Sequence, residues 1–358
     1  MSLRARKHAV GRQDELFGIF MNGRIDMNEK KNLKAVLTGT QRKPMPLLSF
    51  PSVQLLGCKV GDFVQDAQMQ ARGICAIAQR YPMAAAVSMM DLSVEAEAFG
   101  TQIRFDDHEV PSVIGAVAPG AQEVRQLPVP AVGAARTGEY LKAVSIAAQE
   151  ISDRPVLAGV IGPFSLAGRL MDMTEIMVNC YVDPETVHLL LEKVTSFLVE
   201  YCRAYTQTGA AGIVIAEPAA GLLSPELNQE FSVPYVKQMI EAVQSENFGV
   251  IYHNCGNVVP LLDDLLSIGA QGYHFGNAVD LAEVLARVPA DTPVLGNIDP
   301  VSCFRNGTCE NMENAVRTLC DRLKQYPNFV LSSGCDIPPA SKMENIEAFF
   351  KAAQEVWS

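Results

Sequence analysis

A histidine and two cysteines are the residues of this chain whose types and spacing suggest chemistry. His253 and Cys255 stand one residue apart in VIYHNCGNVV (250–259), directly after an apolar run. Cys335 has the same setting in FVLSSGCDIPP (329–339), where small residues separate it from an apolar run. Imidazole nitrogen and thiolate sulfur are the ligands that zinc prefers. The three residues therefore predict a zinc site, with a chance pairing of buried core thiols as the alternative.

The number of candidate ligands indicates which kind of zinc site to expect. Structural sites use four protein ligands, whereas catalytic sites use three and keep the fourth position open. The chain offers H-x-C and one distant cysteine but no C-x-x-C pair, which favours the open type. Two thiolates already donate charge to the ion, so it activates water poorly and is better suited to hold a substrate thiol as a thiolate. The predicted chemistry is alkyl transfer to sulfur.

The elements that must position these residues are repeated strand-then-helix units. Continuous apolar segments, each followed by a helical stretch, indicate parallel strands that are buried on both faces. They lie at 155–163, 210–218, 248–256, 270–276, 292–299 and 328–336. Residues 44–50 and 83–91 supply two more strands, and a hairpin excursion is expected within the irregular stretch 92–154. Eight units predict an α/β fold of the (β/α)8 TIM-barrel class.

An open doubly wound sheet is the alternative fold, and it would need a glycine-rich phosphate turn after its first strand. The chain contains neither G-x-G-x-x-G nor G-x-x-x-x-G-K-[ST]. In a barrel, the carboxyl ends of all strands meet at one mouth. We expect the following residues to gather there: Asp91, Pro163, Glu217, His253, Cys255, Asn297, Asp299 and Cys335.

Length and composition limit the function classes. The 358 residues, 48% hydrophobic and 19% charged, suit one large domain, predicted over 33–358 with an N-terminal extension at 1–32. Residues 1–43 hold ten Lys/Arg and four acids, typical of a solvated tail or of a contact arm for a partner subunit. The net charge of −11 argues against a nucleic-acid binder. We expect a cytoplasmic protein without membrane insertion, because no apolar stretch approaches the roughly 20 residues of a span and no signal peptide is visible.

Several motifs resemble the uroporphyrinogen decarboxylase superfamily, and more closely its methylcobamide:coenzyme M methyltransferase branch. They are HNCGN, LGNIDPV, SSGCDIPP followed by ENIEAFF, MMDLSVEAEAFG (89–100), GPFSLAGRL (162–170) and EPAAGLLSPELNQEFSVPY (217–235). The resemblance covers roughly residues 33–358. It implies a barrel in which His253, Cys255 and Cys335 bind catalytic zinc. It also implies transfer of a methyl group from a methylcorrinoid, carried by a separate protein, to a small thiol such as coenzyme M.

The other mouth residues receive provisional roles. Glu217 and Asp299 are catalytic candidates, with Glu217 ligating the metal or orienting a ligand; the alternative for both is capping of a nearby turn. Asp91 and His274 are candidates for contacts with cofactor or substrate, with an N-cap and core packing as the respective alternatives. Arg169 suits the sulfonate or carboxylate of a thiol substrate, with a surface ion pair as the alternative.

Two other functions compete with methyl transfer. A metal-free lyase of the decarboxylase type would act on an acidic tetrapyrrole, but RKPMPLLSFP is not followed by the arginine-rich segment of those enzymes. A non-catalytic barrel that binds a corrinoid protein or stores zinc is the third possibility. DDHEVP (106–111) has proline where a fused corrinoid domain with D-x-H-x-x-G needs glycine. The corrinoid is therefore expected on another protein, which docks at the mouth.

Overall fold

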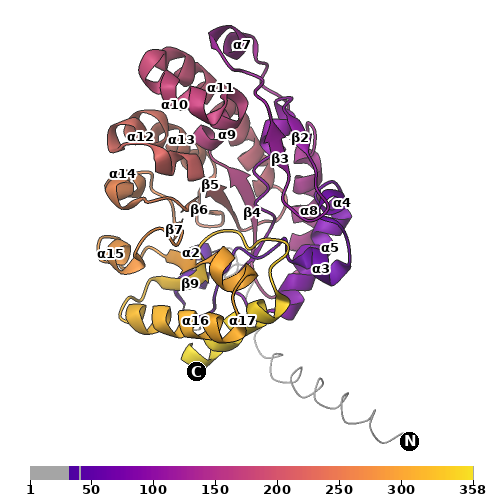
Figure 1. The fold of residues 1–358 in the computed structure, drawn as a ribbon, viewed down its shortest axis with the longest axis vertical. Coiled ribbons are helices and arrows are strands. Elements are labelled where there is room, and N and C mark those ends of the chain that lie inside the picture. The colour runs from indigo at the N-terminus through magenta and orange to yellow at the C-terminus, as the bar shows by residue number, and fades with distance from the viewer. Residues whose placement is uncertain (1–31, 40–41, 358) are drawn as a thin grey trace, which may run out of the picture.

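The structure is a computed structural model that describes residues 32–39 and 42–357. The N-terminal extension predicted at 1–32 lies outside the described residues except for Asn32. The side chain of Asn32 accepts a hydrogen bond from Ala35 N and caps helix α2 (Leu33–Thr38). The remainder of the described chain is a ring of strands enclosed by helices (Figure 1).

Seven parallel strands of the described chain form one sheet in the order β1-β4-β5-β6-β7-β8-β9. Their bounds are β1 (Ala86–Val87), β4 (Val156–Ile161), β5 (Gly212–Ala216), β6 (Gly249–Asn254), β7 (Gly272–Phe275), β8 (Val294–Ile298) and β9 (Phe329–Ser333). The register pairs Ala216 with His253 and His253 with His274. Because β-branched and apolar residues fill these strands on both faces, they are buried as the sequence predicts.

The gap between the first and last strands is closed by residues 42–49, which form no regular strand. Met45 N donates to Leu331 O of β9 at 2.9 Å, and Ala84 N, just before β1, donates to Pro44 O at 2.9 Å. The predicted strand at 44–50 is therefore replaced by an irregular closing segment, because Pro44 and Pro46 have no N–H to complete a ladder. With this segment in place the predicted (β/α)8 barrel is confirmed.

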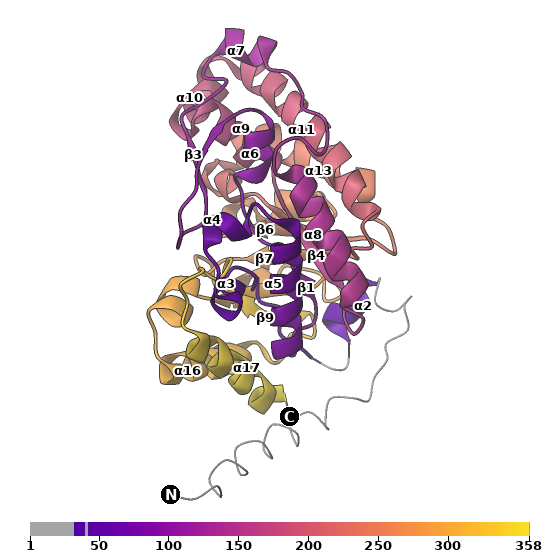
Figure 2. The same ribbon diagram turned by 90° about the vertical axis from the view of Figure 1, so that its right-hand side faces the viewer.

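Helices cover the outside of the barrel (Figures 1 and 2). The longer covering helices are α5 (Ala67–Arg80), α8 (Thr137–Glu150), α11 (Pro184–Thr206), α13 (Val233–Val243), α16 (Cys309–Leu323) and α17 (Met343–Trp357), and α14 (Leu262–Ser267) and α15 (Leu281–Leu285) are short. Local sequence explains where several of them begin. Asp66, Asp183 and Thr308 each accept a hydrogen bond from a backbone N–H of the first turn of the helix that follows.

Additional short elements follow the strands at the mouth or precede α5. They are α3 (Ser52–Leu56), α4 (Val60–Phe63), α6 (Val94–Ala98), α7 (Ala121–Gln126), α9 (Pro163–Met171), α10 (Met173–Val182), η2 (Pro218–Leu222), α12 (Pro225–Phe231), η3 (Val259–Leu261) and η4 (Pro300–Arg305). The predicted hairpin excursion is confirmed: β2 (Gln102–Arg104) and β3 (Ser112–Ile114) pair antiparallel. Within the described chain, no helix combines the length and the apolar character that crossing a membrane requires.

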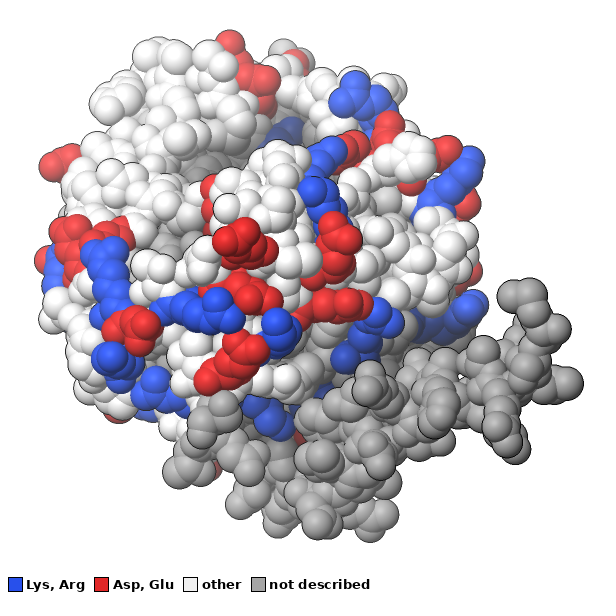
Figure 3. Space-filling model, turned by 60° about the horizontal axis from the view of Figure 1, so that its bottom comes forward, with Lys and Arg blue, Asp and Glu red and all other residues white. Residues whose placement is uncertain are grey.

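Two hydrophobic clusters form the core. The larger lies between strands and helices, and the smaller fills the barrel with inward-facing strand residues, including Val214, Ile251, Leu295 and Val330. Leu33 of α2 belongs to the inner cluster and lies against Gly249 at the start of β6, so α2 plugs the end of the barrel opposite the mouth. On the outer face shown in Figure 3, acidic and basic side chains are interspersed. The pleat that points Ile251 inward also directs His253 inward at the mouth.

Candidate metal centre

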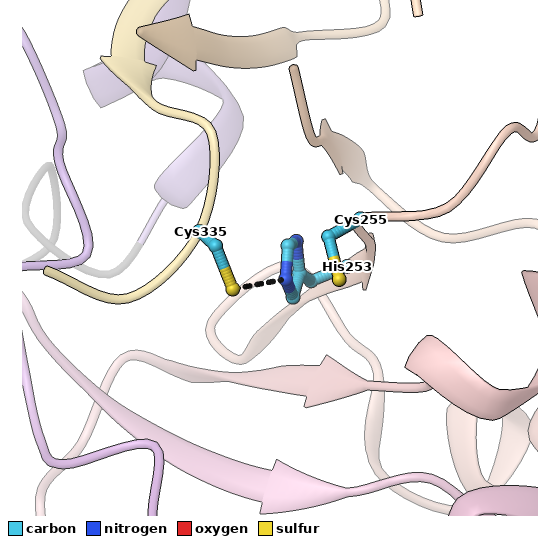
Figure 4. Close-up of side chains that lie close together, drawn as sticks. All are labelled: His253, Cys255 and Cys335. Carbon is cyan, nitrogen blue, oxygen red and sulfur yellow. Dashed lines mark hydrogen bonds between the residues drawn. The ribbon is translucent and has the colours of Figure 1, made fainter. Parts of the chain in front are cut away.

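His253, Cys255 and Cys335 converge at the mouth of the barrel. One ligand atom from each lies within 4.8 Å of the others, and of the described residues only these three form such a group. Cys335 Sγ lies 3.5 Å from His253 Nε2 (Figure 4). His253 is buried at the end of β6, and both cysteines are half-buried in the loops that follow β6 and β9. The structure therefore brings together the residues that the sequence predicted as ligands.

The chain after β6 is held so that Cys255 faces the other two residues. Asn254 donates from Nδ2 to Glu217 O at 2.6 Å, and its Oδ1 accepts from Gly256 N at 2.8 Å. Gly276, just past β7, lies against this turn: a Cβ there would stand 2.6 Å from the Cα of Cys255. Only glycine permits so close an approach, so Gly276 helps to set the position of the cysteine.

The loop that carries Cys335 is fixed by the closing segment. Leu47 N donates to Ser333 Oγ and Ile337 N donates to Leu47 O, each at 3.0 Å, so this one residue holds the loop on both sides of the cysteine. Gly334 N donates to Ile298 O of β8. The irregular segment that seals the barrel therefore also positions one candidate ligand.

The two cysteines share a negative charge. A hydrogen bond with Cys335, and then one with His253, lowers the pKa of Cys255 to about 4. The same contact with Cys255, together with burial, raises the pKa of Cys335. Thiolate is the form of cysteine that binds metals, and one imidazole nitrogen with two sulfurs is a donor set that suits zinc. The chemistry and the closeness of these atoms fit the predicted ion.

His274 lies behind His253, away from the mouth. It is fully buried, its Nδ1 lies 2.8 Å from His253 Nδ1 and its Nε2 lies 2.9 Å from Ser332 Oγ. Burial, and then the neighbouring His253, lowers the pKa of His274 well below its ordinary value. His274 has no exposed surface and both of its ring nitrogens contact neighbouring side chains, which agrees with core packing, the alternative considered from the sequence.

Glu217 caps a neighbouring helix. It is fully buried at the end of β5, and its carboxylate accepts hydrogen bonds from Phe164 N at 3.0 Å and Ser165 N at 2.6 Å in the first turn of α9. The N-cap residue of that helix, Gly162, has no side chain to do so. Burial raises the pKa of Glu217 to about 7. The carboxylate does not belong to the three-residue group.

Asp299 and Asp91 are also occupied by hydrogen bonds. Asp299 Oδ1 accepts from the backbone of Val301 and Ser302, which makes Asp299 the N-cap of η4. Asp91 is buried, and its Oδ2 accepts from Arg136 Nη1 at 2.5 Å and from Tyr140 Oη at 2.8 Å. Both carboxylates therefore hold the walls of the mouth in place.

Arg169, near the end of α9, differs from the other cations of the mouth. Its Nε is buried without a hydrogen-bond partner, and no ion pair to the guanidinium is formed within the described part of the chain. The carboxylates of Asp91 and Glu95 act on its charge, while burial lowers its pKa. Arg169 Nε is thus an unused donor.

Three structurally important residues were missed by reasoning from sequence: Arg136, Asn254 and Ser332. Ser332 is two residues after Val330 in β9, so both side chains face the inside of the barrel. The alternation of side chains along the strand could therefore have identified Ser332 as an inward-facing residue. Asn254 stands between His253 and Cys255 in the sequence, and its part in holding the turn can be recognised only from its contacts. Arg136 lies in a Gly/Ala-rich stretch with no local signal for its pairing with Asp91.

Comparison with known proteins adds a family and a fold. The model of a family described as "Uroporphyrinogen decarboxylase (URO-D)" matches residues 29–356. The methylcobamide:CoM methyltransferase MtbA of Methanosarcina acetivorans is 29% identical over 268 residues, which are 74% of this chain and 77% of MtbA. A uroporphyrinogen decarboxylase of Hydrogenovibrio crunogenus is 25% identical over 290 residues, 78% of this chain and 80% of that protein. The solved structure of a methyltransferase from Methanosarcina mazei has the same fold, with a TM-score of 0.82 at 22% identity over 92% of this chain and 99% of that one.

Proposed function

The chain belongs to the uroporphyrinogen decarboxylase family, and on this premise we propose that it transfers a methyl group from a methylcorrinoid to a small thiol such as coenzyme M. The convergence of His253 Nε2 with the sulfurs of Cys255 and Cys335 carries the proposal. A set of two sulfurs and one imidazole suits sulfur alkylation better than hydrolysis. The similarity to a methylcobamide:CoM methyltransferase supports the same reaction.

The cofactor of the proposed reaction is zinc. His253, Cys255 and Cys335 would hold it, with the cysteines supplying the charge that the ion requires. When bound, zinc would favour the deprotonated form of an incoming thiol, whose proton is released to solvent, and would so supply a nucleophilic thiolate. Glu217 and Asp299 support the site by capping α9 and η4, and we propose no direct chemical role for either.

Arg169 is proposed to contact the negatively charged group of the thiol. Its Nε is buried without a hydrogen-bond partner, and the planar fork of N–H groups of a guanidinium matches a sulfonate or carboxylate. An anion here would also supply the acceptor that the buried Nε lacks. This proposal makes a short thiol with an anionic end the preferred acceptor.

The methyl donor is proposed to arrive on a separate corrinoid protein. The described large hydrophobic side chains that are most exposed all lie in the excursion after β1 or in short elements that follow other strands at the mouth. They are Phe105, Ile114, Val129, Val178, Tyr181, Val182, Leu222 and Val301. Exposed apolar side chains gathered at one end of a molecule are typical of a protein-docking surface.

A methyl-transfer assay tests the proposal. Purified protein is incubated with methylcobalamin and a panel of thiols, with chelator, and with chelator followed by zinc. We expect methylation of an anionic thiol that chelator abolishes and zinc restores. Conversion of uroporphyrinogen by metal-free protein would instead establish the decarboxylase reaction of other relatives, and bound zinc without transfer to any thiol would indicate a non-catalytic role.

A further inference from the structure

A chain of buried hydrogen bonds leads from the closing segment of the barrel to the candidate metal ligand His253. Ser332 Oγ lies 2.6 Å from Met45 O, and His274 Nε2 lies 2.9 Å from Ser332 Oγ. The other nitrogen of the same ring, His274 Nδ1, lies 2.8 Å from His253 Nδ1. His253 Nε2, at the far side of its ring, faces Cys335 Sγ. All the donors and acceptors between Met45 and His253 are buried.

The direction of each hydrogen bond follows from the first. A carbonyl oxygen can only accept, so the hydroxyl hydrogen of Ser332 is directed to Met45 O. Ser332 Oγ must then accept from His274 Nε2–H. A neutral imidazole with its hydrogen on Nε2 has a lone pair on Nδ1, so His274 Nδ1 accepts from His253 Nδ1–H. The carbonyl oxygen of His274, 3.2 Å from the same nitrogen, is a second acceptor for that hydrogen.

The opposite arrangement would require a positively charged His274. Both of its nitrogens would then donate, and His253 would carry its hydrogen on Nε2, where the candidate ligand atom is. No carboxylate among the described residues forms a hydrogen bond or ion pair with His274, and a fully buried cation without a counter-charge is costly. The neutral chain is therefore favoured.

We infer that His274 and Ser332 are positioning residues that keep a hydrogen on Nδ1 of His253, so that Nε2, which faces the two cysteine sulfurs, is the atom left to bind a metal. This inference rests on the metal site proposed above. On this inference the folded barrel sets the orientation of the His253 ring, because the hydrogen-bond chain ends at the backbone carbonyl of Met45. Loss of a hydrogen-bond partner of a metal-ligating histidine typically weakens metal binding by roughly 10–100-fold.

Zinc affinity, measured by competition with a chromogenic chelator, is the first test. His274→Phe keeps a ring but removes the nearer acceptor, Nδ1, and leaves only the backbone carbonyl of residue 274 at 3.2 Å, and we expect roughly 10–100-fold weaker binding. His274→Asn restores an acceptor oxygen near the position of Nδ1 and should recover part of the loss. Ser332→Ala should weaken binding, and Ser332→Thr, which keeps the hydroxyl, should weaken it less. His188→Phe is the matched control, because His188 is a half-buried histidine bonded to Tyr235 on another part of the barrel.

The tautomer itself is the second test, and it needs neither zinc nor activity. Long-range 1H–15N spectra of the chelator-treated protein should show His253 with a hydrogen on Nδ1. In His274→Phe that signature should shift toward the Nε2–H form. A wild-type His253 whose only ring hydrogen is on Nε2, or equal zinc affinity in wild type and a folded His274→Phe, would overturn the inference. A wild-type protein that binds no zinc but shows the Nδ1–H tautomer would refute the proposed function and leave the hydrogen-bond chain standing.

Discussion

Cys335 Sγ lies 3.5 Å from His253 Nε2 although 82 residues separate them in the chain. In the sheet, β7 and β8 stand between β6, which carries His253, and β9, which precedes Cys335. Curvature of the barrel and the loop after β9, held by Leu47 of the closing segment, bring the sulfur across the mouth. The site is thus assembled from chain segments that no local interaction connects.

Substitution of Cys335 should abolish tight zinc binding. We expect the wild-type protein to bind about one zinc ion per chain, and Cys335→Ser to bind it more than about 100-fold more weakly, since a ligand contributes more than the partner of a ligand does. Metal analysis after dialysis against a weak chelator measures this. Cys309→Ser, at an exposed cysteine, should retain the metal. Retention of zinc by Cys335→Ser would contradict the proposed ligand set.

Gly276→Ala should disturb the metal centre through Cys255. The added methyl group would stand 2.6 Å from the Cα of Cys255, so the turn that follows β6 must move. We expect a loss of about 1–3 kcal/mol of stability and measurably weaker zinc binding, followed by thermal unfolding and chelator competition. Gly120→Ala is the control, because its new methyl group meets only the flexible side chain of Glu123. Unchanged zinc affinity in Gly276→Ala would show that this contact does not set the position of the cysteine.

Glu217→Gln should show whether Glu217 caps helix α9 or binds the metal. An amide has one acceptor oxygen where the carboxylate serves both Phe164 N and Ser165 N, so one buried donor loses its partner. We expect stability to fall by about 1–3 kcal/mol, measured by denaturant unfolding, with zinc affinity unchanged. Glu200→Gln, on the exposed face of α11, should change neither quantity. A large drop in zinc affinity would instead make Glu217 a ligand.

Arg169→Met should discriminate between thiols. Loss of a charge-assisted contact to an anion costs about 1.5–3 kcal/mol, so KM for a sulfonate- or carboxylate-bearing thiol should rise roughly 10- to 100-fold. The KM for uncharged 2-mercaptoethanol should stay the same, as should both values in Arg203→Met, whose guanidinium lies on the surface. Steady-state methyl transfer with both thiols provides the measurement. Equal effects on the two thiols would argue against an anion contact.

Glu95 should make folding stability depend on pH. Burial raises the pKa of Glu95 from an ordinary 4.5 to about 7, so the folded protein binds a proton that the unfolded chain has released. The stabilising contribution of the neutral acid is complete below pH 4.5 and is lost as the pH rises through about 7, which amounts to about 3 kcal/mol. Glu95→Gln should therefore flatten the fall in unfolding free energy over this range. Superimposable pH profiles of wild type and variant would contradict this assignment.

Much of the architecture follows from the sequence alone. Continuous apolar segments that alternate with helical stretches specify buried parallel strands, and parallel strands bring their carboxyl ends to one mouth. His253, Cys255 and Cys335 are therefore predicted together as candidate ligands from the sequence. The strand predicted at 44–50 is wrong: its hydrophobic pattern is typical of a strand, but Pro44 and Pro46 lack the N–H groups that a ladder needs.

Tertiary structure decided the partners of the polar residues. Whether Glu217 caps its own turn or the helix after the adjacent strand, whether Asp91 stays free or pairs with Arg136, and which way His274 turns all depend on barrel curvature and on inter-strand register. Local propensity and pleat periodicity carry no information about which distant groups arrive within about 3 Å, the range over which a hydrogen bond forms. The sequence determines which residue types are present, and the closed barrel determines which of their polar groups form hydrogen bonds with one another.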